Sequence, residues 1–194
     1  MIKAIIFDFF GVLVTEGFSR FCDKCFPNDQ EKRRAALELV TMHDWGKLSQ
    51  DEYIDGLAKL AGVDRKFVED HMEDNQANDS LLSYIRTELK PKYKVAVLSN
   101  SGDDYLSKIL EKQDAELFED IILSYQYGLV KPQSAIFDLA ASRLGVEPGE
   151  CVFIDDSPTH CAGAEGVGMK TIRYDNFPQM KTDLEKILST DANN

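Results

Sequence analysis

The sequence has no apolar run long enough to cross a membrane, since a spanning helix needs about 20 consecutive apolar residues. The chain opens with a short apolar segment, residues 2–7, which Lys3 interrupts and which no small-residue cleavage site follows. This segment therefore lacks the form of a secretory signal. We expect a cytoplasmic protein that has no membrane partner.

Positive charge is also scarce, because 22 lysines and arginines stand against 34 aspartates and glutamates and give a formal net charge of −12. An acidic surface repels the phosphates of nucleic acids and of anionic membranes, so we expect neither as a partner. A small anionic substrate stays compatible with this charge if a bound metal or a few lysines reverse the field inside a pocket.

Cysteine is limited to four residues, which are Cys22, Cys25, Cys151 and Cys161. Cys22 and Cys25 have the spacing of a redox motif or of half a zinc site, but the sequence contains no second pair of this kind. In a cytosolic protein we expect reduced thiols with a structural role.

The apolar residues that are present gather in short runs that predict the strands of a parallel sheet. The runs are apolar or β-branched at nearly every position, as in strands that are covered on both faces. They cover Ile2–Phe7, Lys94–Leu98, Ile121–Leu123, Cys151–Ile154 and Lys170–Ile172. Helical patterns alternate with them and cover Asp103–Glu111, Pro132–Leu144 and Met180–Leu188. This alternation predicts an α/β fold with a Rossmann-like, doubly wound parallel sheet.

Residues 15–80 interrupt the alternation, because they contain helical patterns and no strand-like run. An amphipathic pattern covers Glu31–Met42, and Ser49–Glu52 is a capping box that opens another helix. We therefore expect an all-helical cap here, inserted into a core domain that consists of residues 1–14 and 81–194.

Polar residues stand at or just beyond the ends of the predicted strands. They are Asp8, Ser99, Asn100, Lys131, Asp155 and Asp156. Ligands of an open parallel sheet bind outside the carboxyl ends of its strands, so we expect these side chains to converge there. Their carboxylates would repel one another unless a cation joins them. Oxygen ligands favour Mg²⁺, which also binds phosphate oxygens, so the set predicts phosphate chemistry.

Four short motifs resemble those of the haloacid dehalogenase superfamily in order and in spacing, and the resemblance covers the whole chain. They read FDFFGVL, VAVLSNSG, YGLVKP and CVFIDDSP. The helical segment after the first motif looks like the first type of cap in this superfamily. The stretches DWGKLSQDEY and LSNSG also resemble the branches of glucose-1-phosphatases and of the amino-terminal domains of epoxide hydrolases.

The resemblance implies roles for the residues that match these motifs. Asp8 would be the nucleophile that becomes an aspartyl-phosphate. Ser99 would hydrogen-bond the phosphoryl group with help from Asn100, and Lys131 would pair with Asp8 and with the phosphate.

The resemblance also implies a magnesium site. Asp155 and Asp156 would hold the ion, with Asp156 as the direct ligand. One carboxylate oxygen of Asp8 and the backbone carbonyl of Phe10 would complete the protein ligands.

Phe10 departs from the family pattern, because the phosphatases usually carry a second aspartate two positions after the nucleophile. That aspartate protonates the leaving group and activates water, which is typically worth about 10²–10⁴-fold in rate, and phenylalanine has no proton to give. Three interpretations follow: a phosphatase weakened by the missing acid, a metal-independent 2-haloacid dehalogenase, and an inactive phosphate-binding or interaction module. The Asp155-Asp156 doublet favours the first over the second, since it would repel the carboxylate of a haloacid.

The substrate is not named by the sequence, and the resemblance implies only a small phosphorylated metabolite. Specificity would reside in the cap, whose closure would exclude water. Arg20, close after the first motif, is our candidate for binding a substrate anion. A monomer and a homodimer both stay open.

Overall fold

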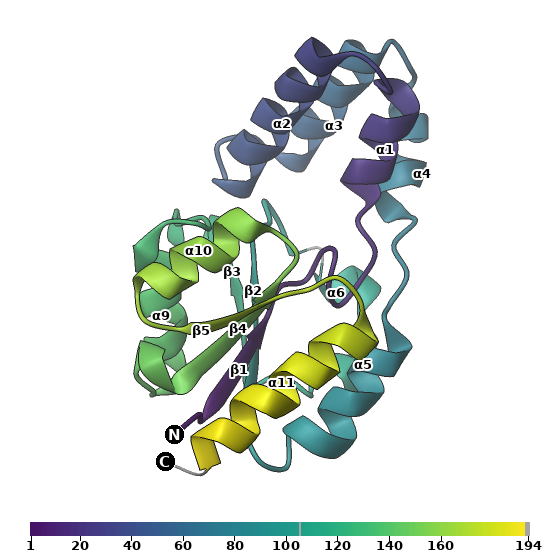
Figure 1. Cartoon of the computed structure of the whole chain (residues 1–194). Coiled ribbons are helices and arrows are strands. Elements are labelled where there is room, and N and C mark those ends of the chain that lie inside the picture. The colour runs from purple at the N-terminus through teal and green to yellow at the C-terminus, as the bar shows by residue number, and fades with distance from the viewer. Residues whose placement is uncertain (105, 193–194) are drawn as a thin grey trace.

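The computed structural model describes residues 1–104 and 106–192, and it contains a core built on a sheet with a helical unit above it (Figure 1). The sheet has five parallel strands in the order β3-β2-β1-β4-β5. The strands are β1 (Ala4–Phe7), β2 (Lys94–Ser99), β3 (Asp120–Leu123), β4 (Cys151–Asp155) and β5 (Lys170–Arg173). Each overlaps an apolar run of the sequence, so the prediction of a parallel α/β sheet is confirmed.

Helices cover both faces of this sheet, which explains why its strands do not alternate between apolar and polar residues (Figure 1). Ile5 and Phe7 of β1 pack with α5 and α11, whereas Ala4 and Ile6 pack with α9 and α10. The helical elements of the core are α5 (Asp79–Tyr84), the π-helical turn η1 (Ile85–Leu89), α6 (Leu106–Ile109), α7 (Lys112–Ala115), α8 (Ser124–Tyr127), α9 (Ser134–Leu144), the 3₁₀ turn η2 (Pro148–Glu150), α10 (Pro158–Gly166) and α11 (Phe177–Ala192).

Two of these helices differ in length from their sequence patterns. The pattern over Asp103–Glu111 yields only the short α6, because the Asp103 carbonyl, which a longer helix would use, accepts a 2.7 Å hydrogen bond from the Ser101 hydroxyl. Residue 105 of this pattern lies outside the described residues. Helix α11 begins earlier than its pattern, because the Asn176 side chain accepts a hydrogen bond from a backbone N–H of its first turn.

The helical unit is inserted between β1 and α5. Its helices are α1 (Gly17–Cys25), α2 (Gln30–Asp44), α3 (Gln50–Ala61) and α4 (Arg65–Glu73). They enclose an apolar cluster of their own, in which Phe21, Ile54 and Leu57 are fully buried. The capping box predicted at the start of α3 is present, since Ser49 and Glu52 each accept a hydrogen bond from the other's backbone N–H.

Two antiparallel linkers join the helical unit to the core. Val14 bridges Ala77, and the Thr15 N–H donates a 3.0 Å hydrogen bond to the Gln76 carbonyl. We propose domain boundaries at these linkers, close to the predicted cap of residues 15–80, whose last two residues already belong to the core helix α5. Within the described ranges, none of the helices is long and apolar enough to span a bilayer.

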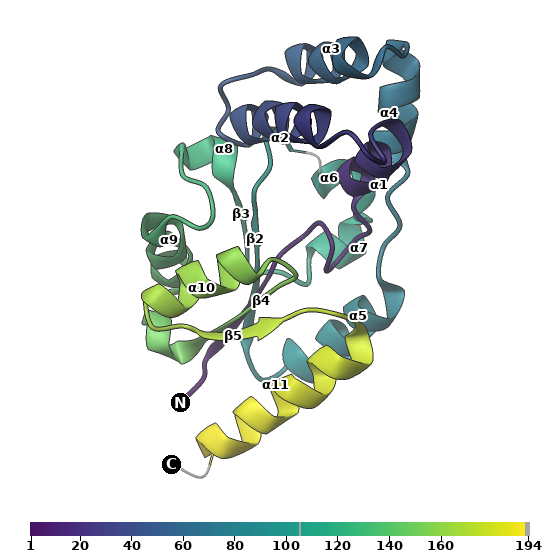
Figure 2. The same ribbon diagram turned by 45° about the horizontal axis from the view of Figure 1, so that its top comes forward.

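The cap touches the core where the end of α2 reaches α8 (Figure 2). The buried Ser124 hydroxyl donates a 2.6 Å hydrogen bond to the Asp44 carbonyl and accepts one of 2.9 Å from the Ser101 N–H. Beside it, Gly102 lies so close to the His43 ring that a Cβ at this position would overlap the imidazole. These contacts hold the end of α2 over the carboxyl end of β2.

We expect Ser124→Ala to lower the free energy of unfolding by about 1–3 kcal/mol, because it leaves buried backbone groups without their partner. Urea denaturation measures this loss. Ser142→Ala, an exposed change on α9, is the matched control and should stay within about 0.5 kcal/mol. Equal unfolding midpoints for Ser124→Ala and the wild type would show that this contact does not stabilise the fold.

Candidate active site

Four buried polar residues meet at the carboxyl edge of the sheet, as the sequence predicted. Asp8 directly follows β1, Ser99 ends β2, Asp155 ends β4, and Lys131 lies in the loop between α8 and α9. Strand β1 pairs with both β2 and β4, so its end lies between theirs. The parallel order of the strands thereby places a carboxylate pair and an ammonium group together.

Lys131 lies between the two carboxylates. Its Nζ is 2.8 Å from Asp8 Oδ1 and 2.7 Å from Asp155 Oδ2, and the lysine side chain is 1% exposed. Asp8 Oδ1 also accepts a 2.6 Å hydrogen bond from the Phe9 N–H. The near-complete burial means that solvent barely screens these interactions.

His160 is a member of this cluster that our sequence reasoning missed. Its Nδ1 lies 3.1 Å from both Asp155 oxygens, and Asp155 Oδ1 also accepts a 2.8 Å hydrogen bond from the Ser157 N–H. The Ser157 side chain caps α10 by accepting a hydrogen bond from the His160 N–H, so His160 is held in the first turn of the helix. Its position five residues after Asp155, at a helix start, was the available signal.

The charges of the cluster do not balance, because one ammonium faces two buried carboxylates. Burial, and then the charge of Asp155, raise the pKa of Asp8 well above its usual range, although Lys131 acts in the opposite direction. Burial would also raise the pKa of Asp155, but Lys131 and His160 outweigh it and leave that pKa low. A further cation next to Asp8 would relieve this imbalance.

Asp156 extends the carboxylate set towards solvent. It is exposed and lies over Gly11, where an added Cβ would stand 2.6 Å from Asp156 Oδ2 and where φ is +83°. Glycine is therefore required at this turn for both space and conformation. Among the described residues, Asp8, Asp155 and His160 each offer a ligand atom, and these atoms all lie within 4.8 Å of one another, so they could hold a metal ion together.

Asn100 holds Lys131 in place. Its Oδ1 accepts a 2.8 Å hydrogen bond from the Lys131 N–H, and its Nδ2 donates a 3.1 Å bond to the Lys131 carbonyl. Ser99 is fully buried and is not among the described residues that line the cavity, whereas Ser101 is. The predicted anion-binding Arg20 also stays outside this lining, because its guanidinium donates to the Asp74 carbonyl.

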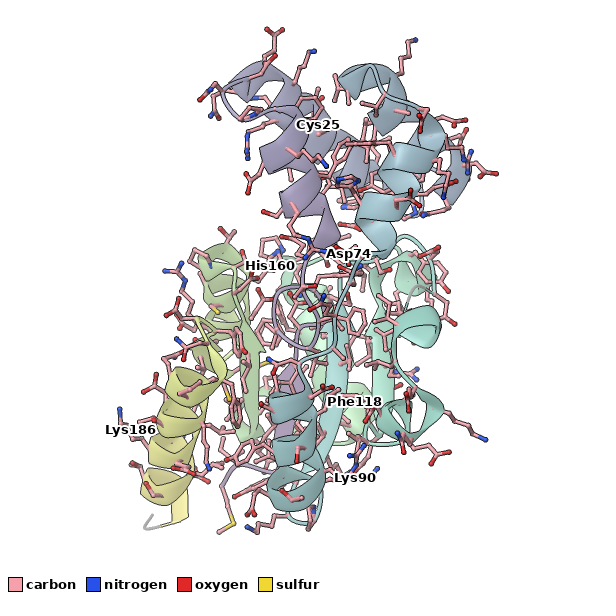
Figure 3. All side chains as sticks on the ribbon, turned by 90° about the vertical axis from the view of Figure 1, so that its right-hand side faces the viewer. Cys25, Asp74, Lys90, Phe118, His160 and Lys186 are labelled. Atoms are coloured by element: carbon pink, nitrogen blue, oxygen red, sulfur yellow. The ribbon has the colours of Figure 1, made fainter. Side chains whose placement is uncertain are left out.

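A cavity of about 460 Å³ lies above the cluster, between cap and core. Asp8, Lys131 and Asp156 form its floor, and its apolar wall includes Phe10 and several aromatic and aliphatic side chains of the cap. Figure 3 shows His160, which also lines it, at the junction of the two parts. The site can therefore enclose a small anionic molecule against the carboxylates.

Three residues of the cap that line this cavity each carry a buried polar atom. Within the part of the chain that the structure describes, His43 Nε2, Trp45 Nε1 and Asn75 Oδ1 are buried and have no hydrogen-bond partner. Such atoms are costly unless something pairs with them.

The fold and the site define a hydrolase with a buried aspartate–lysine cluster beneath a helical cap. The profile of the haloacid dehalogenase-like hydrolases matches residues 2–168, and the chain belongs to this family. This result confirms the resemblance seen in the four motifs.

Similar proteins extend over nearly the whole chain. The D-ribitol-5-phosphate phosphatase of Bacteroides thetaiotaomicron is 27% identical over 98% of this chain and 100% of its own. A solved structure of a family enzyme from the same organism, a complex with magnesium and inorganic phosphate, has a TM-score of 0.71 at 26% identity over 90% of this chain and 95% of its own. A protein of Porphyromonas gingivalis described as a predicted HAD-like family hydrolase has a TM-score of 0.75 at 26% identity, over 97% and 98%.

We expect Lys131→Met to cost about 3–5 kcal/mol in the free energy of unfolding, because it leaves two buried carboxylates without a counter-charge. Lys66→Met, at an exposed ion pair of the cap, should cost less than about 1 kcal/mol in the same urea experiment. Adding Asp8→Asn to Lys131→Met should recover part of the loss. A double variant no more stable than Lys131→Met would contradict the electrostatic explanation.

Proposed function

We propose that this protein is a magnesium-dependent hydrolase of a small phosphate monoester and acts through an aspartyl-phosphate on Asp8. The observation that carries the proposal is the position of Asp8, which is bound to a buried lysine at the floor of an enclosed cavity. The phosphatase name of one relative and the magnesium and phosphate in a neighbouring structure support it.

The carboxylates of this chain fit a magnesium ion. Asp8, Asp156 and the backbone carbonyl of Phe10 would hold it, while Asp155 contributes negative charge and keeps Lys131 in place. Oxygen ligands of this kind suit Mg²⁺, and the unbalanced charge around Asp8 provides the attraction. When bound, the ion would neutralise phosphate oxygens and keep Asp8 ionised.

The remaining groups orient the phosphate. Asp8 attacks phosphorus, and Lys131 stabilises the charge on the transferred phosphoryl group. The Asn100 side chain positions Lys131 by accepting a hydrogen bond from its backbone N–H and donating one to its backbone carbonyl. For Ser99 we keep the hydrogen bond to the phosphoryl group that the family resemblance implies, which requires its buried hydroxyl at the end of β2 to become accessible from the cavity. All of these groups come from one chain, so the site would be complete in a monomer and in a homodimer. We propose that the protein is cytoplasmic.

The two alternatives to a phosphatase account for the site less well. A haloacid dehalogenase has no use for Asp156 in the lining of the cavity, because that carboxylate repels the carboxylate of the substrate. A pure binding module does not require a nucleophile with one carboxylate oxygen held by a lysine. Both remain alternatives that the assay below distinguishes.

The substrate we propose carries hydroxyl groups on the part that leaves. The indole N–H of Trp45 is a donor, the Asn75 Oδ1 is an acceptor, and the His43 ring nitrogen can act as either. A hydroxyl both donates and accepts, so a polyol or sugar phosphate would pair these atoms once the cap side chains shift to expose them, since all three are buried in this structure. D-ribitol 5-phosphate, the substrate in the name of one relative, has this chemistry.

We expect turnover of p-nitrophenyl phosphate that requires Mg²⁺ and that Asp8→Asn reduces at least about 10³-fold, because the nucleophile is lost. Release of nitrophenolate measures it, and Asp138→Asn, an exposed change on α9, is the control. Chloride release from a 2-chloro acid in EDTA would indicate a dehalogenase instead. Phosphate binding without any turnover would indicate a binding module.

We expect Trp45→Phe to raise KM for a polyol phosphate about tenfold, since one buried hydrogen bond is worth roughly 1–1.5 kcal/mol. The ring is retained, so KM for p-nitrophenyl phosphate should change much less. Steady-state kinetics on both substrates test this. Equal changes in both KM values would contradict recognition of a hydroxyl by the indole N–H.

A further inference from the structure

The proposed reaction lacks a proton donor at the position where this family usually has one. Phe10 lines the cavity, and its ring packs edge-on against Phe9 with 4.9 Å between centroids. An alcohol leaving group must gain a proton as its bond to phosphorus breaks. If the proposed function holds, another group in the cavity must therefore supply this proton.

Asp44 is an acidic residue of the cap. It is the last residue of α2 and lines the same cavity as Asp8 and Lys131. Its backbone carbonyl accepts the 2.6 Å hydrogen bond from Ser124, a residue of the core. This contact holds the end of α2 over the core when the cap is closed, so the carboxyl group has a defined place in the cavity.

The surroundings of Asp44 favour a proton at neutral pH. Burial raises the pKa of its carboxyl group to about 7, with Lys131 lowering it and the negative charge of Glu16 raising it. The other titratable groups among the described residues that line the cavity are Asp8, Glu16, His43, Tyr53, Asp103, Lys131, Asp156 and His160. A group that is half protonated near pH 7 can both give and take a proton.

We propose that Asp44 is a catalytic residue of this enzyme, which donates a proton to the leaving group from the cap and so replaces the acid that Phe10 lacks.

The two steps balance in atoms and charge. As an Asp8 oxygen bonds to phosphorus, the bond from phosphorus to the leaving oxygen breaks, and the proton of Asp44 moves to that oxygen to give the free alcohol. In the second step water bonds to phosphorus, and the bond between phosphorus and the Asp8 oxygen breaks. Asp44 takes the proton of this water, which restores the carboxylic acid and releases inorganic phosphate.

Glu16 is the other carboxyl group that the cap side brings to the cavity, and it differs in its surroundings. Burial raises its pKa too, but the next influences are Asp156 and Arg20, whereas those on Asp44 are Lys131 and Glu16. The charge of Lys131 thus acts on the pKa of Asp44 and is not among the main influences on the pKa of Glu16. Glu16→Gln is the matched control, since it neutralises a carboxyl group of the same cavity.

The test compares Asp44→Asn, Glu16→Gln and the wild type on two substrates with magnesium. An alkyl phosphate needs a proton on its leaving group, whereas nitrophenolate leaves p-nitrophenyl phosphate as an anion. We expect kcat/KM of Asp44→Asn to fall about 10²-fold or more for the alkyl phosphate and to stay within about threefold for the nitrophenyl ester. Its kcat on the ester should fall after a burst, because the second step lacks its base.

Three results would overturn this assignment. Asp44→Asn could leave both substrates unchanged, or lower kcat/KM equally for both, as a structural defect would. A loss that depends on the leaving group could instead appear in Glu16→Gln. A wild type inactive on every phosphate would overturn the proposed function itself and this inference with it, which separates the two failures.

Thermal unfolding gives a readout without activity. Between the ordinary pKa of 3.8 and about 7, the unfolded chain loses the Asp44 proton while the folded chain keeps it, so wild-type stability falls as pH rises through this window. Asp44→Asn lacks this penalty. Its melting temperature relative to the wild type should therefore rise by a few degrees from pH 5 to pH 8. A difference independent of pH would contradict a buried, protonated Asp44.

Discussion

The contact between Lys131 and the two carboxylates it bridges is the constraint on which the site depends. Asp8 and Asp155 end adjacent strands, and without an ammonium 2.7–2.8 Å from each they would be two buried like charges. The lysine compensates only part of this charge. The remaining negative charge creates the demand for a metal ion and prepares the cavity for a phosphate, so one ion-pair cluster links the stability of the core to the chemistry proposed for it.

Much of this arrangement could be predicted from the sequence, because it follows from the topology of the sheet. Once apolar runs are identified as parallel strands, the residues at their ends must share one edge. Asp8 and Asp155 needed no further information, whereas Lys131, in the loop between α8 and α9, was assigned to the site from the resemblance of its motif. The parallel α/β sheet and the family are confirmed, whereas the roles of these residues remain predictions.

The parts that sequence could not reveal depend on how the cap sits on the core. Neither the residue type of Asp44 nor its spacing from the motifs indicates a catalytic role, because acidic residues are common near the end of an amphipathic helix. Its significance arises from burial and from the Ser124 contact, which joins residues 80 positions apart. Arg20 shows the reverse case: a basic residue near the first motif suggested anion binding, but the fold turns its guanidinium to a backbone carbonyl of the cap.

The paired linkers at the cap boundary have a consequence for the catalytic cycle. Val14 and Ala77 form an isolated antiparallel bridge, so the two linkers lie side by side where they join the cap to the core. A movement of the cap away from the core would break the hydrogen bond that the Ser124 hydroxyl donates to the Asp44 carbonyl. The movement that releases the product would therefore also carry the Asp44 carboxyl group away from Asp8. In its open form the enzyme would lack its proposed proton donor.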